Sequence, residues 1–105
     1  NLPINARWVN DQTPVYDPKL KHGQGSPVVE VVLRRKSDKE VFAFVLNQGG
    51  QGDGQMQCNL PGNWQITDVL SDQTMQPIRY RNTTSLKLSL PGFGYRVFRM
   101  VKTGS

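Results

Sequence analysis

The stretch from Val28 to Asn47, VVEVVLRRKSDKEVFAFVLN, is the longest apolar run in this 105-residue chain, and a polar segment interrupts it in the middle. Apolar residues alternate on both sides of that segment with the period of two that a β-strand requires. The polar residues 36–39 supply the turn of a β-hairpin. The first arm has one apolar and one mixed face, whereas the second arm is apolar on both faces. We therefore expect residues 41–46 to form a central strand.

Short alternating segments, separated by turn residues, make up the chain that follows the hairpin. Residues 48–54 are so rich in glycine that they are predicted to form a loop, and the next strand places Cys58 on an apolar face with two neighbours. Further strands are predicted over residues 64–70, 76–81, 85–90 and 95–101. No segment has apolar residues at helical spacing. About seven short strands predict an all-β fold, a two-sheet antiparallel β-sandwich.

The strand phases also predict which side chains form the core. The residues expected inside are Phe44, Leu46, Cys58, Trp64, Ile66, Leu86, Leu88 and Val97. The change of phase after Ile66 predicts a bulge or strand end near Asp68, whose carboxylate would accept hydrogen bonds there. Pro77 indicates an edge or irregular strand.

The proposed domain organisation follows from the density of backbone breakers. Residues 1–27 contain four prolines and are interpreted as an extended lead-in or linker, although residues 6–9 could form a short edge strand. Residues 28–102 are assigned to the sandwich and residues 103–105 to a tail. Because the chain starts with Asn1, we interpret it as a piece of a longer protein. No apolar run approaches the roughly 20 residues of a membrane span, so no membrane partner is expected.

The net charge and the numbers of cysteine and histidine residues argue against several classes of function. The net charge of +5 is scattered over strand faces apart from one cluster, residues 34–36 at the hairpin tip, and no RNA-binding signature accompanies it. This pattern argues against nucleic-acid binding. The chain has one cysteine, Cys58, and one histidine, His22, so no internal disulfide can form and no metal site or cofactor is predicted. The compartment is left open.

Several framework motifs occur in a recognisable order. The hairpin ends in Asn47, a Gly-rich loop follows, Trp64 precedes Asp68-Val69-Leu70, and the last strand begins Gly94-Tyr95-Arg96-Val97-Phe98. This order resembles the small all-β domain that follows the catalytic barrel in many glycoside hydrolases, in the α-amylase clan and in some barrel β-galactosidases. The resemblance covers residues 28–102 and implies framework roles for these residues. None of them is catalytic in that family.

Catalysis by this chain alone is not expected. Glycosidic cleavage needs two carboxylates about 5 to 10 Å apart across a sugar. Each acidic residue of this chain can instead be explained by a structural role. Asp38 and Asp72 fit turns, and Glu30 and Glu40 fit solvated cross-strand pairs.

Three functions from different classes remain. The first is an accessory domain that packs against and stabilises the catalytic barrel of a parent glycoside hydrolase. The second is a carbohydrate-binding module, which needs exposed aromatic rings beside amide and acid groups. Its candidate residues are Trp8, Tyr16, Tyr80, Phe93, Gln51 and Asp53. The third is an oligomerisation or protein-interaction module that uses exposed edges and the second apolar face of the hairpin.

Overall fold

The predicted hairpin forms one side of the larger of two sheets in this computed structural model, which describes residues 4–11 and 26–104. Its arms are β2 (Val29–Ser37) and β3 (Glu40–Asn47). The strand β3 lies between β2 and β9 (Tyr95–Thr103), which confirms the predicted central position. A register shift between Arg35 and Ser37 marks a β-bulge next to the turn.

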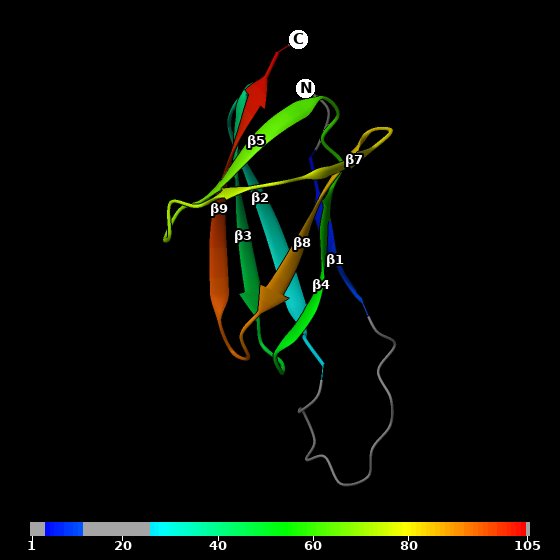
Figure 1. Cartoon of the computed structure of the whole chain (residues 1–105), viewed down its shortest axis with the longest axis vertical. Helices are drawn as coiled ribbons and strands as arrows, with labels where there is room; N and C mark the ends of the chain where they lie inside the picture. The colour runs from blue at the N-terminus through cyan, green and yellow to red at the C-terminus, as the bar shows by residue number, and fades with distance from the viewer. Residues whose placement is uncertain (1–3, 12–25, 105) are drawn as a thin grey trace, which may run out of the picture.

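The strands form two antiparallel sheets that face each other, and the described residues contain no helix (Figure 1). One sheet has the order β2-β3-β9-β5-β6, with β5 at Asn63–Asp68 and β6 at Thr74–Met75. The other has the order β1-β4-β8-β7. Its strands are β1 (Ala6–Asn10), β4 (Gly52–Cys58), β7 (Ile78–Tyr80) and β8 (Thr83–Leu90). The predicted all-β sandwich is thus confirmed, with nine strands in the described residues where about seven were expected.

Two segments contribute more strand than the sequence suggested. The strand β1 pairs with β4, so part of the predicted lead-in belongs to the four-stranded sheet, as the alternative of an edge strand over residues 6–9 foresaw. The strand β4 starts at Gly52, inside the stretch that was expected to be a loop. A side chain at Gly54 would overlap the Trp8 ring and the Val9 carbonyl. This glycine therefore permits close packing of β1 on β4, and the prediction of a loop there was wrong.

The core lies between the sheets and is built from the side chains of the two inner faces. It consists of Val41, Ala43, Val45, Met56, Cys58, Leu60, Trp64, Ile66, Leu86, Leu88, Leu90, Phe98 and Met100. Five of the eight predicted core residues are among them. The other three, Phe44, Leu46 and Val97, are not, because β3 and β9 turn the opposite phase inward: Phe44 is 42% exposed and Leu46 is 41% exposed.

Asn47 connects the end of the hairpin to two loops. Its side chain is buried, its Oδ1 accepts hydrogen bonds from the N–H groups of Val28 and Gly49, and its Nδ2 donates to the carbonyls of Gly50 and Pro91. These four hydrogen bonds use the full capacity of the amide. Asn47 thereby fixes the start of β2, the Gly-rich loop and the turn between β8 and β9.

Asp68 is the last residue of β5 and accepts hydrogen bonds at this strand end, as predicted. Its Oδ1 accepts hydrogen bonds from the N–H groups of Leu70 and Ser71, and its Oδ2 forms an ion pair with Nη2 of Arg96 at 2.7 Å. Burial by itself raises the pKa of this carboxyl group, but the Arg96 and backbone hydrogen bonds outweigh burial and hold the pKa below its usual value. The charged carboxylate therefore stabilises the turn after β5.

Candidate functional site

Trp8, the first candidate for sugar binding, lies on the inner side of β1. Its ring is partly buried against the core and covers Gly54, and its Nε1 donates to Oδ1 of Asn10 at 2.6 Å. A stacking platform needs a ring face that is open to solvent. Trp8 therefore serves the packing of β1 in this structure.

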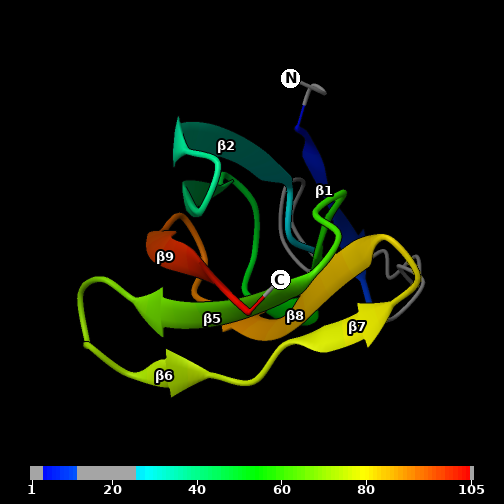
Figure 2. The ribbon, with the colours of Figure 1, turned by 90° about the horizontal axis from the view of Figure 1, so that it is seen from above.

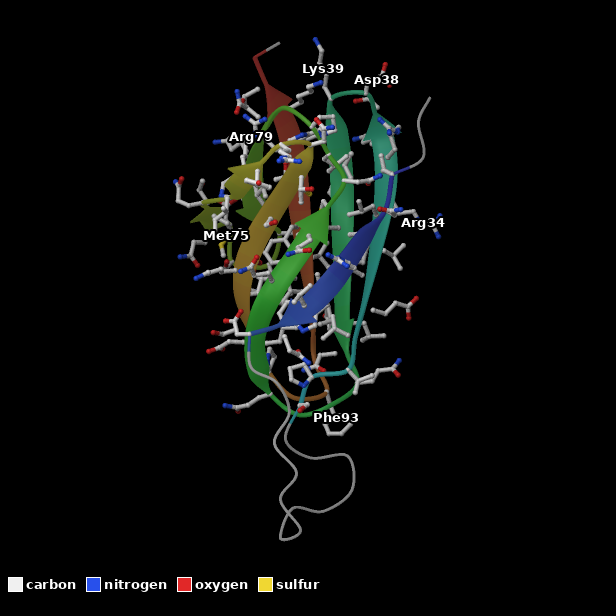
Figure 3. All side chains as sticks on the ribbon, turned by 90° about the vertical axis from the view of Figure 1, so that its right-hand side faces the viewer. Arg34, Asp38, Lys39, Met75, Arg79 and Phe93 are labelled. Atoms are coloured by element: carbon white, nitrogen blue, oxygen red, sulfur yellow. The ribbon has the colours of Figure 1, made fainter. Side chains whose placement is uncertain are left out.

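The other candidates lie at different places in the sandwich. Phe93 is 78% exposed in the turn between β8 and β9, and its N–H donates to the Gly49 carbonyl, so it lies near Gln51 at the lower end of the molecule (Figure 3). Asp53 is exposed on β4, opposite Ser89. Tyr80 is 68% exposed and lies on the edge strand β7, paired with Thr83. Tyr16 falls outside the described residues.

These positions do not assemble a common platform among the described residues. Phe93 and Gln51 come together, whereas Tyr80 ends the edge strand that pairs with the beginning of β8, and Phe93 follows the end of β8. The two exposed rings are therefore separated by the length of that strand, which at about 3.4 Å per residue spans more than 20 Å. One sugar ring cannot contact both.

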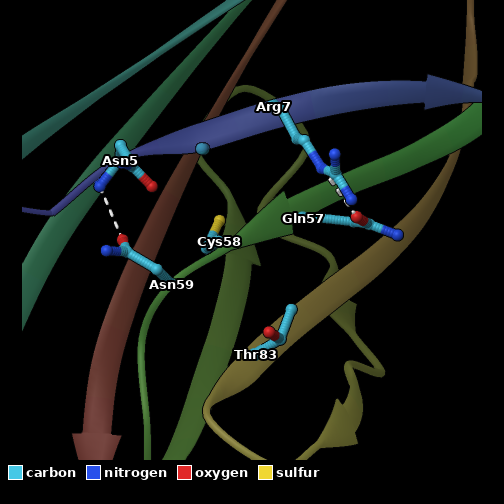
Figure 4. A pocket seen from close by; sticks show the side chains of 7 residues that line it. Asn5, Arg7, Gln57, Cys58, Asn59 and Thr83 are labelled. Carbon is cyan, nitrogen blue, oxygen red and sulfur yellow. Dashed lines mark hydrogen bonds between the residues drawn. The ribbon is translucent and has the colours of Figure 1, made fainter.

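A hollow of about 340 Å³ opens beside the paired ends of β1 and β4 (Figure 4). Its lining is mostly polar and includes Asn5, Arg7, Gln57, Asn59 and Thr83, with none of the six candidates. Arg7 Nε donates to Gln57 Oε1 at 3.1 Å, and the Asn5 N–H donates to Asn59 Oδ1 at 2.6 Å. Two pairs of residues in this hollow, Arg7 with Gln57 and Asn5 with Asn59, are thus already joined by hydrogen bonds.

The acidic residues of the described ranges are used in ion pairs or lie singly on the surface. Asp68 is paired with Arg96, and Glu40 is paired with Arg99 and Lys36 on the outer side of β3. The hydrogen bond from Arg99 is the main cause that holds the pKa of Glu40 below its usual value. Among residues 4–11 and 26–104, no group of three or more His, Cys, Asp or Glu residues is placed to hold a metal ion. That part of the chain likewise contains no helix long and apolar enough to cross a membrane.

Among the described residues, the outer side of the five-stranded sheet carries a contiguous group of partly exposed apolar side chains. Val32, Phe44 and Val97 lie in one row across β2, β3 and β9, and Leu46 and Tyr95 are neighbours in the next row. Leu46 is 41% exposed and Tyr95 is 61% exposed. We call Val32, Phe42, Phe44, Leu46, Tyr95 and Val97 the apolar face. Charged residues border it, with Glu30 beside Leu46, and Arg34 and Arg99 on either side of Phe42.

The outer side of the four-stranded sheet has the opposite character. Its cross-strand rows contain Arg7, Asp53, Gln55, Gln57, Ser85, Lys87 and Ser89. Val9 lies among these polar residues and is 38% exposed, and the apolar residues Ile78 and Tyr80 lie on the same outer side at the edge strand β7. The outer side of the four-stranded sheet is therefore mostly polar, whereas that of the five-stranded sheet carries a contiguous group of partly exposed apolar residues. Contiguous exposed apolar surface is a common feature of contact sites in proteins.

Sequence reasoning anticipated a second apolar face on the hairpin, but it assigned three residues of the apolar face, Phe44, Leu46 and Val97, to the core. A signal was present in the charged residues of the same phase: Glu40 shares a face of β3 with Phe44, and Arg99 shares a face of β9 with Val97. Charged groups without a buried partner belong on the solvent side. No family model, curated protein or solved structure matches this chain.

Proposed function

We propose that this chain is a non-catalytic β-sandwich accessory domain of a glycoside hydrolase, and that its apolar face packs against the catalytic barrel of the same polypeptide. The glycoside hydrolase part of the proposal rests on the resemblance of the framework motifs. The structure adds a physical role to these motifs: Asn47 anchors two loops, Trp64 is a core residue, and Asp68 pairs with Arg96. These are the roles expected of framework residues.

The exposure of the apolar face is the observation that carries the proposal. Three large side chains, Phe44, Leu46 and Tyr95, are each more than two-fifths exposed on neighbouring strands. Leaving them in water forfeits about 25 cal/mol for every Å² of apolar surface that a partner would cover. Interfaces between domains of one chain typically bury about 600 to 1,500 Å². A face that spans three strands and is bordered by charges has the shape and chemistry for such an interface.

The carboxylates of the described residues supply the argument against catalysis. Glu40 and Asp68, whose pKa values are lowered, are held by arginine partners in positions that explain the shift. A glycosidase needs one carboxyl group with a raised pKa as its general acid. The shifts in the described residues run in the other direction, and each has a structural cause.

The proposal is tested by a pair of matched substitutions in the longer polypeptide and in the isolated chain. Leu46→Lys places a charge on the apolar face, and Val9→Lys places the same charge at a similarly exposed position on the polar side. Leu46→Lys should lower the melting temperature of the complete enzyme and increase protease cleavage between its domains, while it changes the isolated chain by less than about 1 kcal/mol. Val9→Lys should leave the complete enzyme unchanged. Equal effects of the two variants on the enzyme would refute packing through the apolar face.

Calorimetric titration separates this proposal from the carbohydrate-binding alternative. Starch, galactan and simple oligosaccharides are titrated into the isolated chain, and the same sugars are assayed for hydrolysis. We expect neither saturable binding nor turnover. Binding tighter than about 1 mM, worth roughly 4 kcal/mol, that disappears in Trp8→Ala or Tyr80→Ala would favour a binding module instead.

A further inference from the structure

The strand β2 is the outer edge of the five-stranded sheet and lies at the margin of the molecule (Figure 2). The N–H of Gln48 donates to the carbonyl of Val28 at 2.8 Å. In an antiparallel pair the residues alternate in direction, so even-numbered residues of β2 point their backbone groups toward β3. The N–H and C=O groups of Val29, Val31 and Leu33 therefore point away from β3, and no backbone hydrogen bond within the described ranges joins β2 to β1, which belongs to the other sheet.

Within the described residues, the end of this edge next to the hairpin turn carries features that hinder pairing. The bulge between Arg35 and Ser37, together with the charges of Arg35 and Lys36, interrupts the end next to the hairpin turn. Bulges and positively charged side chains are the devices by which natural proteins prevent edge pairing. Residues 29–34 keep a regular register with β3 and contain no proline, glycine or lysine. This part of the edge retains the form of a strand that can accept a partner.

The charges on this part of β2 are complementary to those of a second, antiparallel copy of the same strand. Glu30 and Arg34 are exposed on either side of Val32 on the outer side of the sheet, and neither forms an ion pair with another described residue. When two copies of β2 pair about Val32, each Glu30 lies opposite an Arg34, and Val31 lies opposite Leu33. Arg35, the last residue before the bulge, then lies opposite Val29, so no like charges lie opposite each other over residues 29–35.

We infer that two copies of this chain associate through antiparallel pairing of their β2 strands, centred on Val32. Val31 and Leu33 exchange backbone hydrogen bonds, and the pairs formed by Glu30 and Arg34 occupy non-hydrogen-bonded positions, where side chains lie closest. The two five-stranded sheets join into one, with both apolar faces on the same side. Pairing uses the edge and leaves the apolar face open, so the inference does not depend on the proposed function. One strand pair buries less than about 1,200 Å², and the dimer is therefore a weak one.

Sedimentation equilibrium of the 105-residue chain tests the pairing over protein concentrations from about 10 μM to 1 mM. The mass should rise from 11.8 kDa toward twice that value. Glu30→Arg sets two arginines against each other at both ends of the pair, and Arg34→Glu sets two glutamates there. Each variant should weaken the dimer about tenfold or more. The first raises the net positive charge by two and the second lowers it by two, so an effect of net charge would drive the two variants in opposite directions.

Combining the variants makes the test specific to this pairing. The double variant Glu30→Arg/Arg34→Glu restores both opposite-charge pairs and should restore the dimer, and an equimolar mixture of the two single variants should form a heterodimer. Circular dichroism checks that all variants are folded, and Lys87→Glu on the polar outer side should leave the dimer unchanged. A monomer at every concentration would overturn the inference. So would a dimer that ignores both charge reversals, or one that Leu46→Lys disrupts while Glu30→Arg does not.

Discussion

At the scale of the residue, Asn47 shows how one amide can hold several segments together. It is 1% exposed, and its four hydrogen bonds go to backbone groups of β2, the Gly-rich loop and the turn before β9. Each of those backbone groups would otherwise lack a partner in a site with little access to water. The strand-ending asparagine noted in the sequence is thus explained by the loops it connects.

We predict that Asn47→Asp destabilises the chain by about 2 to 4 kcal/mol, because a carboxylate accepts from Val28 and Gly49 but cannot donate to the carbonyls of Gly50 and Pro91. Urea unfolding at neutral pH measures the change. Asn59→Asp, an exposed asparagine, is the control and should change stability much less. A loss below about 0.5 kcal/mol for Asn47→Asp would show that the network contributes little to stability.

Cys58 is fully buried on the inner side of β4, and burial raises the pKa of its thiol to about 12. The thiolate is the reactive form, and almost none is present at neutral pH. We predict that a thiol reagent labels the native protein only as fast as the protein unfolds. Labelling rates measured with and without denaturant check this, and rapid labelling without denaturant would contradict it.

At the scale of the element, β3 and β9 explain both the success and the failure of the sequence analysis. Strand positions could be predicted because period-two alternation and turn residues mark them along the chain. The side of the strand that points into the core could be predicted for β8, where Leu86 and Leu88 alternate with polar residues. The inward side of β3 could not be predicted from its apolar residues, because Val41, Ala43 and Val45 are as apolar as the residues between them. The choice depends on tertiary partners, namely the core side chains of the facing sheet, such as Met56, Leu86 and Leu88.

The same reasoning applies to the candidate site. The apolar surface could be anticipated from the second apolar face of the hairpin, but its members were assigned to the wrong side. Gly54 was assigned to a loop because composition alone cannot show that Trp8, nearly fifty residues earlier, packs on it. Contacts between distant segments are not encoded in local periodicity.

A pair of leucine truncations tests the facing of the strands. Leu88 is 4% exposed and Leu46 is 41% exposed. We predict that Leu88→Ala costs about 2 to 5 kcal/mol, as for a buried leucine, and that Leu46→Ala costs the isolated chain less than about 1 kcal/mol. Thermal or chemical unfolding of the two variants provides the measurement. Similar losses for both would mean that the apolar face is covered in the isolated chain.

At the scale of the whole molecule, the two outer sides divide the tasks of the sandwich. The outer side of the four-stranded sheet is mostly polar, whereas the apolar face and the β2 edge are adjacent because Val32 of β2 belongs to the apolar face. The hairpin supplies the β2 edge and four of the six residues of the apolar face, and β9 supplies the other two. The segment that contributes β3 to the core therefore also supplies most of these two surfaces.

The stability of the whole molecule in acid should depend on Asp68. Because its pKa in the folded state lies below the value of about 3.9 in the unfolded chain, its charge stabilises the fold above that pH, and this contribution is lost as the pH falls toward the folded pKa. We predict that Asp68→Asn costs about 1 to 3 kcal/mol at pH 7 and that its difference from the wild type shrinks below about pH 4. Unfolding curves over this pH range test it, with the exposed Asp53→Asn as the control. A difference that stays constant with pH would contradict the role of the ion pair with Arg96.

The double apolar character of β3 has a consequence for the uniqueness of the native state. A strand whose two faces are equally apolar can be rotated about its axis, or shifted in register by one residue, with little change in the apolar surface it buries. What distinguishes the two arrangements is polar: Asn47 must face inward to reach its four backbone partners, and Glu40 must face outward to reach Arg99. These two residues, at the ends of the strand, therefore select one orientation and register of β3 from two that bury similar apolar surface.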